Sequence, residues 1–185
     1  MKAQIIGFAK RLLRRLLGDY GIYYVLTRAC DQLEAVPAGT AVVPVDAAMV
    51  RASPDPDLRG QSFYAGADAL GYGYIENGAL ASLCFYWYGE RYKTRNFWPL
   101  QEGEIKLVEI VTAAAMRGRR LAPALINASL HDVARRGFRR AYARVWHSNT
   151  ASLRAFEAAG WERIALVVEI FPFGRTTPLR WKKRI

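Results

Sequence analysis

Apolar residues recur at helical spacing in several stretches of the chain. In residues 3–17 the side chains of Phe8, Leu12 and Leu16 share one side and basic residues the other, which predicts an amphipathic helix. A second helix is expected from Tyr20 to Leu33. Further helices, each followed by a glycine that would end it, are predicted over residues 121–136 and 150–159, the second with Ser148 or Asn149 as its N-terminal cap.

Shorter apolar runs, bounded by glycine, proline and asparagine, predict strands. They cover residues 40–45, 71–75, 80–88, 105–112, 141–145 and 167–171. Asn77-Gly78 separates two of these runs and is typical of a tight hairpin turn. Residues 53–60 contain two prolines and are predicted to form a loop or turn. The order strand, helix, strand, helix, strand in the C-terminal half predicts an α/β unit with a mixed sheet.

The composition fits one globular domain with a sizeable core. The chain has 185 residues, of which 52% are apolar and 23% charged. Cys30 and Cys84 make no disulfide framework or zinc pattern, and two histidines are too few for most metal sites, so we expect no metal. No apolar run reaches the ~18 residues of a spanning helix. Basic residues also interrupt the N-terminal apolar stretch, which argues against a secretory signal, so we expect a cytoplasmic protein.

Positive charge is concentrated in three segments. The net charge is +11, and residues 1–17, 117–144 and 175–185 carry the excess while the remainder is net negative. Such segments bind nucleic acid, anionic lipid or a phosphorylated ligand, or form ordinary solvated surface. The sequence contains no helix-turn-helix, zinc-finger or RNA-recognition signature, so we expect no nucleic acid partner. The basic helix over 3–17 either packs on the body of the protein or makes a peripheral contact with an anionic membrane.

The central basic segment overlaps a strand, loop and helix. The strand over 105–112 leads into a loop with Arg117, Gly118, Arg119 and Arg120 at the start of the next helix. Unpaired amides and the helix dipole at a helix N-terminus favour phosphate oxygens. This arrangement therefore predicts a pyrophosphate site, although its spacing matches neither the nucleotide P-loop nor the dinucleotide fingerprint.

Two signatures in this part of the chain resemble those of the GNAT N-acetyltransferases. Residues 117–122, Arg-Gly-Arg-Arg-Leu-Ala, resemble the family's acyl-coenzyme-A loop, Arg/Gln-x-x-Gly-x-Gly/Ala. Residues 145–149, Val-Trp-His-Ser-Asn, with the helix and the Gly160-Trp161 pair after them, resemble its second signature. The two occur in order and at the family's separation, and the resemblance covers about residues 70–172.

The resemblance implies a fold and a domain organisation. The fold class is α/β (α+β), with a mixed, mostly antiparallel sheet flanked by helices. Residues 37–185 would form a single GNAT-like acyltransferase domain, and residues 1–36 an additional N-terminal helical extension. The resemblance also allows a homodimer.

The resemblance further implies transfer of an acetyl group from acetyl coenzyme A to a primary amine of a small molecule. The amine would attack the thioester directly, helped by positioning and by a backbone amide that polarises the carbonyl. The donor would lie where two neighbouring strands separate, against the loop on one side and the second signature on the other. The residues implied in donor binding are Val111, Thr112, Arg117, Gly118, Arg119, Arg120, Leu121, Ala122, Asn149, Ser152 and Phe156.

An amine acceptor needs a base, because an alkyl amine is mostly ammonium at neutral pH. Glu109 is the best candidate, since it interrupts an otherwise apolar strand just before the loop, where some family members place a glutamate base. A carboxylate drawn out of water becomes a stronger base. The alternatives are that Glu109 lies on a solvent face, that Glu104 is the base, or that His147 faces the cleft.

The sequence departs from the family pattern at two positions. The central glycine of the loop, which lets the backbone approach phosphate, is Arg120 here, and its guanidinium could either add a phosphate contact or weaken donor binding. Phe156 stands where many members carry a general-acid tyrosine, so Tyr86, Tyr88 or water would protonate the leaving thiolate. Cys84 is expected to be a small core residue and not a nucleophile.

Two other functions stay open on the sequence alone. A longer acyl chain or an acyl carrier protein could be the donor, because such carriers are acidic and the N-terminal helix is basic. A non-catalytic module that binds coenzyme A or a membrane surface would also fit the basic segments and the missing tyrosine. The aromatic-rich region 40–100 is expected to supply the acceptor pocket, whose chemistry the sequence leaves open.

Overall fold

The computed structural model describes residues 19–31, 33, 35–36, 39–174 and 176–185. They form one eight-stranded sheet in the order β2-β3-β4-β5-β6-β1-β7-β8. Neighbouring strands are antiparallel except β5 and β6, which are parallel, so the expected mixed and mostly antiparallel sheet is confirmed. The strands are β1 Tyr20–Ala29, β2 Val42–Pro44, β3 Ala69–Glu76, β4 Ala79–Trp87, β5 Glu104–Thr112, β6 Arg140–Trp146, β7 Glu162–Ile170 and β8 Leu179–Arg184.

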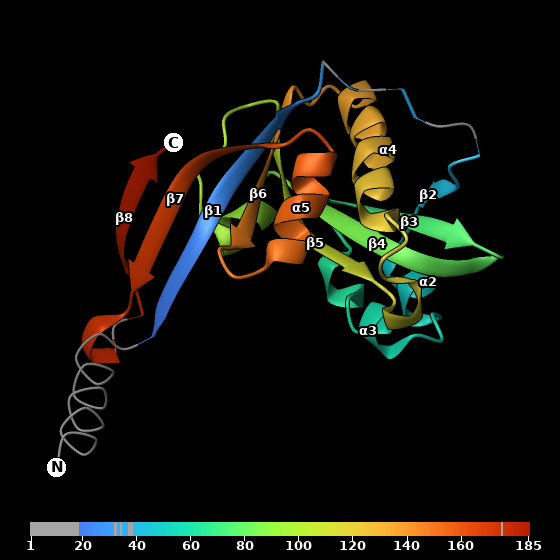
Figure 1. The fold of residues 1–185 in the computed structure, drawn as a ribbon, viewed down its shortest axis with the longest axis horizontal. Helices are drawn as coiled ribbons and strands as arrows, with labels where there is room; N and C mark the ends of the chain where they lie inside the picture. The colour runs from blue at the N-terminus through green and yellow to red at the C-terminus, as the bar shows by residue number, and fades with distance from the viewer. Residues whose placement is uncertain (1–18, 32, 34, 37–38, 175) are drawn as a thin grey trace, which may run out of the picture.

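Helices cover both faces of the sheet. The two longer helices, α4 and α5, lie on one face, where their side chains join a core with β4, β5 and β6 (Figure 1). The short helices α2 and α3 pack on the opposite face, over the aromatic side of β4. The helices are α2 Ala47–Arg51, α3 Pro56–Arg59, α4 Leu121–Arg135 and α5 Thr150–Ala158, with short 3-10 turns η1 Ser62–Tyr64, η2 Arg91–Arg95, η3 Ala114–Met116 and η4 Pro172–Gly174.

Local sequence signals set several boundaries as expected. Asn77 and Gly78 both have positive φ, 51° and 76°, as a two-residue turn between antiparallel strands requires. Gly137, with φ of 90°, follows the end of α4. Asn149 caps α5, because its side-chain oxygen accepts the Ser152 N–H at 3.1 Å.

The helix expected from Tyr20 to Leu33 is wrong. Tyr20–Ala29 is strand β1, inserted between β6 and β7 near one end of the sheet and hydrogen-bonded to both. Tyr23 and Val25 pack on one face and Leu26 on the other, each with no exposed surface. A strand buried on both faces reads as a continuous apolar run, which periodicity alone does not distinguish from a helix.

Three further elements differ from the expectation. The loop expected over 53–60 contains α3, which begins at Pro56 after its cap Asp55, whose Oδ1 accepts the Leu58 N–H at 3.0 Å. Helix α2 begins in the same way after Asp46. The basic C-terminal segment forms the edge strand β8, paired with β7. The amphipathic helix expected over 3–17 lies outside the described residues, and within them the expected N-terminal extension contributes a sheet strand.

Candidate active site

A cleft opens where the two parallel strands separate. β5 and β6 pair only from Glu104–Arg140 to Leu107–Ala143, and beyond this point the strands diverge. One extra residue in β5, Val108, makes a β-bulge against β4 at the same level, a feature that re-aims side chains beside functional sites. The cleft holds about 170 Å³ and is lined by Phe97, Leu107, Val108, Glu109, Ile110, Arg144, Val145, Trp146, Asn149, Ser152 and Phe156.

Helix α4 begins just past the end of β5, with its first amides uncapped. Its N-cap residue, Arg120, has a left-handed backbone with φ of 58° and ψ of 23° and makes no side-chain cap. The N–H groups of Leu121 and Ala122 are thus at the positive end of the helix dipole with no capping side chain. The backbone takes the conformation that a glycine would favour, so Arg120 keeps the loop geometry at a cost of roughly 1–2 kcal/mol.

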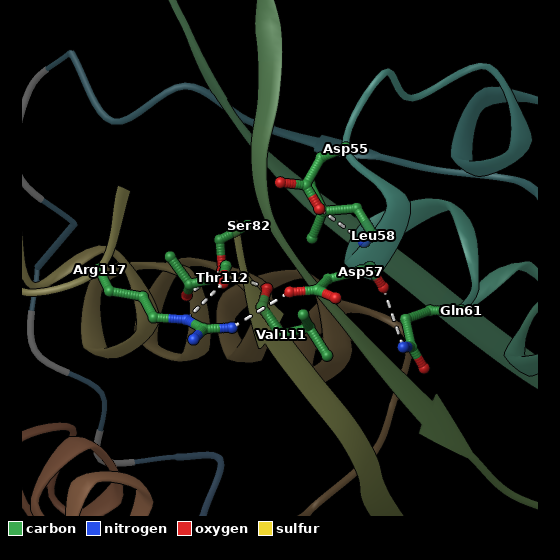
Figure 2. A network of polar contacts seen from close by, with 8 residues as sticks. All are labelled: Asp55, Asp57, Leu58, Gln61, Ser82, Val111, Thr112 and Arg117. Atoms are coloured by element: carbon green, nitrogen blue, oxygen red, sulfur yellow. Dashed lines mark hydrogen bonds and ion pairs between the residues drawn. The ribbon is translucent and has the colours of Figure 1, made fainter. Parts of the chain in front are cut away.

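Two of the three loop arginines are tied to carboxylates. Arg117 donates from Nε to the carbonyl oxygen of Thr112 at 3.2 Å and from Nη2 to Asp57 of α3 at 3.3 Å (Figure 2). Arg119 pairs with Glu76 at the end of β3, with nitrogen and oxygen 2.5 Å apart. Arg120 is exposed and forms no ion pair with the residues that the structure describes.

Val111 and Thr112 lie beyond the lining of the cleft, at the exit of β5. The carbonyl oxygen of Val111 accepts from the Ser82 hydroxyl at 2.8 Å, and that hydroxyl lies 2.9 Å from Oγ1 of Thr112 (Figure 2). Together with Arg117, these bonds fix the end of β5 to β4 and α3. The two residues thus position the strand that leads into the loop.

The second signature lies against the cleft as the sequence predicts for a shared site. Asn149, Ser152 and Phe156 project from the start and inner side of α5 into the lining. The Phe156 ring packs edge-on against Trp161, with centroids 4.9 Å apart, and is almost fully buried. The structure therefore brings Glu109, from the strand before the first signature, and these three residues of the second to one cavity.

Among the expected bases, only Glu109 lines the cleft. It is half-buried, and its Oε1 accepts the N–H of the following residue, Ile110, at 3.1 Å. Glu104 instead accepts from the Tyr142 hydroxyl and the Gln101 N–H, so it stabilises a turn. His147 is exposed and has its Nδ1 3.1 Å from the carbonyl oxygen of Ile22, outside the lining.

No tyrosine lines the described part of the cleft. The Tyr86 hydroxyl is 2.9 Å from Ser129 in the core, and Tyr88 packs on Phe138 at the far end of the sheet, so both expected substitutes for the general acid are misplaced. Cys84 is fully buried, and burial raises the pKa of its thiol to about 12, in agreement with a core role. Within the described residues, no three His, Cys, Asp or Glu side chains gather as a metal site would require.

The sequence did not single out the aromatic and basic residues at the other side of the cleft. Arg144 lies among the rings of Tyr23, Phe97 and Trp146, with its guanidinium carbon 5.2, 5.5 and 5.1 Å from their centroids. Lys106 is fully buried, and its Nζ is 4.1 Å from the ring centroid of Phe97. Phe97 belongs to the aromatic region 40–100 that the sequence predicts to supply the acceptor pocket. Arg144 belongs to the basic segment 117–144, and nothing in the sequence singles it out within that segment.

Comparison with known proteins identifies the family. The sequence pattern of the Acetyltransferase (GNAT) family matches residues 43–161, well over half of the chain. The chain belongs to this family. The matched segment runs from β2 to Trp161, directly before β7, and includes the cleft, the loop before α4 and the cap of α5.

Solved GNAT structures share the fold at low sequence identity. A putative acetyltransferase from Novosphingobium aromaticivorans is 19% identical, with a TM-score of 0.55 over 83% of this chain and 64% of that one. A tandem GNAT protein from the clavulanic acid biosynthesis pathway is 18% identical, with a TM-score of 0.59 over 97% of this chain and 58% of that one. AAC(6′)-Iy, solved with the bisubstrate analogue CoA-S-monomethyl-acetylneamine, is 14% identical, with a TM-score of 0.50 over 68% of this chain and 92% of that one.

The chain spans about three fifths of the length of the first two of these structures. At such identities the likeness establishes the fold alone. No curated protein sequence matches the chain significantly. None of the helices in the described residues is long and apolar enough to cross a membrane.

Proposed function

We propose that the protein transfers an acetyl group from acetyl coenzyme A to the primary amine of a small molecule. The observation that carries this is the continuity of the site. The cleft lies along β5, and β5 leads into the loop and the uncapped N-terminus of α4, so one ligand that follows β5 can have its phosphates on the helix and its thioester between the strands. The GNAT family match supports the same donor.

The pyrophosphate of the donor would be held by backbone amides of the loop and the first turn of α4. Gly118, Leu121 and Ala122 supply amides without a side-chain cap from the described residues, and Arg120 adds a cation that pairs with no acid of that part of the chain. Arg117 and Arg119 act mainly by fixing the loop to α3 and β3. Asn149, Ser152 and Phe156 would contact the other side of the thioester-bearing arm.

The chemical step would be direct attack by the acceptor nitrogen. Glu109 takes a proton from the acceptor ammonium or through one water, which leaves the nitrogen lone pair free to bond to the acetyl carbon. The C–N bond forms, the C–S bond breaks, and its electron pair leaves on the sulfur of coenzyme A. The acylated nitrogen then loses its second proton, which passes through water to that thiolate, since no tyrosine lines the described cleft. In the structure the Ile110 N–H donates to the Glu109 carboxylate. When this carboxylate turns to the acceptor, the N–H becomes free, and it is our candidate to polarise the thioester carbonyl.

Other donors and partners stay predictions. The cleft volume of about 170 Å³ is small beside the roughly 300–1,000 Å³ of typical ligand pockets, which favours a short acyl group over a long chain. Contact with an acyl carrier protein or with a membrane was expected of residues 3–17, which are outside the described residues. A homodimer is likewise an expectation from the family resemblance.

Release of coenzyme A thiol from acetyl coenzyme A in the presence of an amine panel tests this function. We expect amine-dependent thiol release, with the acetylated amine detected by mass spectrometry. A panel that yields neither thiol release nor binding of acetyl coenzyme A would contradict the proposal.

A further inference from the structure

Arg144 is a cation of the cleft that no carboxylate of the described residues neutralises. Its guanidinium is surrounded by the rings of Tyr23, Phe97 and Trp146, and it forms no ion pair in that part of the chain. Rings orient a guanidinium but leave its hydrogen-bond donors unsatisfied. Since Arg144 lines the cleft together with Phe97 and Trp146, those donors can meet a ligand.

The surroundings of Arg144 are positive. Burial is the main cause that lowers the pKa of Lys106 to about 6, and the charges of Arg144, Arg180 and Lys182 act in the same direction, so several cations lie near this buried amine. Of the acidic groups on this face, Glu169 already accepts from the Tyr23 hydroxyl at 2.7 Å and from Arg180 at 2.5 Å. An anion is therefore the ligand that this end of the cleft would stabilise.

Glu109 and Arg144 reach the same face of the sheet from the two separating strands. In the antiparallel registers Glu109 is opposite Phe85 and Arg144 is opposite Val25, and both partners pack on the face away from α4 and α5. The two groups do not pair with each other. The cleft therefore offers one carboxylate and one guanidinium to a ligand that enters from this face.

We propose that the acceptor is a small amine bearing an acidic oxygen group, a carboxylate or a phosphate, which the Arg144 guanidinium binds while the amine faces Glu109. This inference rests on the proposed function and specifies its substrate class. The planar guanidinium matches both acidic groups with two parallel hydrogen bonds. The same charge would disfavour polycationic acceptors.

Gly21 of β1 helps to hold this arrangement. A Cβ on Gly21 would lie 2.8 Å from Cζ3 of Trp146, so the glycine lets the indole pack closely against β1, where it lies beside the Arg144 guanidinium. Gly21→Ala should displace the indole and weaken the binding of anionic acceptors without removing any charge. Gly21→Ala thus changes the position of the indole beside Arg144 and leaves the Arg144 charge in place.

Matched amines test the proposal. For alanine and phenylalanine, their amides and their aminophosphonate analogues, kcat/KM would be measured by thiol release, with spermidine as a polycation. The proteins would be wild type, Arg144→Met, Gly21→Ala and the control Arg51→Met, which removes an exposed arginine on α2. Binding of acetyl coenzyme A by each protein would be measured in parallel.

We expect wild type to prefer one acidic class over the amides by roughly tenfold to a hundredfold, as a charge-assisted bidentate contact would give. Arg144→Met should abolish this preference by raising KM for the acidic amine, and Arg51→Met should not. The carboxylate and phosphonate arms identify the acidic group. Equal or better turnover of amides or spermidine would overturn the inference, and so would an equal loss on both classes in Arg144→Met. If no acceptor reacts although acetyl coenzyme A binds, the inference fails, whereas loss of donor binding in wild type would refute the proposed function itself.

Discussion

The loop before α4 and the cleft itself carry arginines in different surroundings, and of these arginines Arg144 alone lines the cleft in the described residues. In the loop before α4, Arg117 and Arg119 each pair with a carboxylate of a neighbouring element, and this carboxylate offsets the charge of the arginine. In the cleft, Arg144 is surrounded by aromatic rings and has no such partner among the described residues. The comparison separates arginines that build the site from those that can bind a ligand, and it assigns Arg120 and Arg144 to the second class.

The largest effect is expected from the candidate catalytic base. Glu109→Gln should lower kcat by about 100-fold or more, because general-base catalysis commonly contributes 10²–10⁴-fold. Binding of acetyl coenzyme A should stay within a few-fold of wild type, as the donor phosphates bind elsewhere. Steady-state kinetics and calorimetry on the same preparation check both statements. Unchanged kcat would remove Glu109 from the reaction, and Glu104→Gln serves as the matched control.

Lys106 lies near Arg144 and allows the roles of two neighbouring basic residues to be separated. It is a buried amine with no hydrogen-bond partner among the described residues. Its pKa is lowered from 10.5 to about 6, so between these values the unfolded chain binds a proton that the folded chain does not. Stability should therefore rise with pH across this window, and Lys106→Met should stabilise the protein at pH 7 by on the order of a few kcal/mol.

The gain should shrink as pH rises, which denaturant unfolding at pH 7 and pH 9.5 would show. An equal gain at both pH values would mean that proton binding by Lys106 is not its cause. Because the amine is mostly neutral at pH 7, Lys106→Met should also leave the preference for acidic acceptors intact. That outcome would separate its role from that of Arg144.

The next test asks whether the charge of Arg120, in the loop before α4, contributes to donor binding. Arg120→Glu should weaken acetyl coenzyme A binding by about tenfold, since it places an anion beside the donor phosphates. Arg120→Gly should change affinity less and raise stability by about 1 kcal/mol, because glycine adopts the left-handed conformation without strain. Calorimetry and thermal unfolding would check the pair, with Arg51→Glu as the exposed control. Equal affinities of the two Arg120 variants would show that the guanidinium does not face the donor.

The smallest effect is expected from a paired arginine of the loop. Arg119→Gln breaks an exposed ion pair with Glu76, a contact of the kind worth about 0–1 kcal/mol. Donor affinity should change by less than about threefold. A loss as large as that of Arg120→Glu would show that Arg119 leaves Glu76 to bind the donor.

The sequence allowed prediction of the parts of the site that local signals encode. A cap at Ser148 or Asn149, the glycines after α4 and α5 and the hairpin at Asn77-Gly78 depend on nearby residues. The structure has these glycines and the hairpin, and of the two caps it has Asn149. The family resemblance predicts that Glu109 and Asn149 share a cleft, and the structure places both in the cleft where the parallel strands β5 and β6 separate.

The rest depends on contacts that no local pattern carries. Both faces of β1 are buried, so its apolar residues form a continuous run that also fits a helix. Its tyrosines and β-branched residues are the local signal that favours a strand. Whether an arginine is free to bind a ligand depends on whether an acidic side chain from another element pairs with it. Asp57 pairs with Arg117, and no acidic side chain of the described residues pairs with Arg144. Only the fold brings Tyr23, Phe97 and Trp146 around one guanidinium.

Titration calorimetry with acetyl coenzyme A, run beside dephospho coenzyme A on wild type and Arg120→Glu, tests the central claim most directly. We predict micromolar binding of acetyl coenzyme A by wild type, weaker binding of the dephosphorylated ligand, and about tenfold weaker binding of acetyl coenzyme A by the variant. Absence of binding by wild type, or equal affinity of both proteins for both ligands, would contradict the assignment of the loop and the N-terminus of α4 as the donor phosphate site.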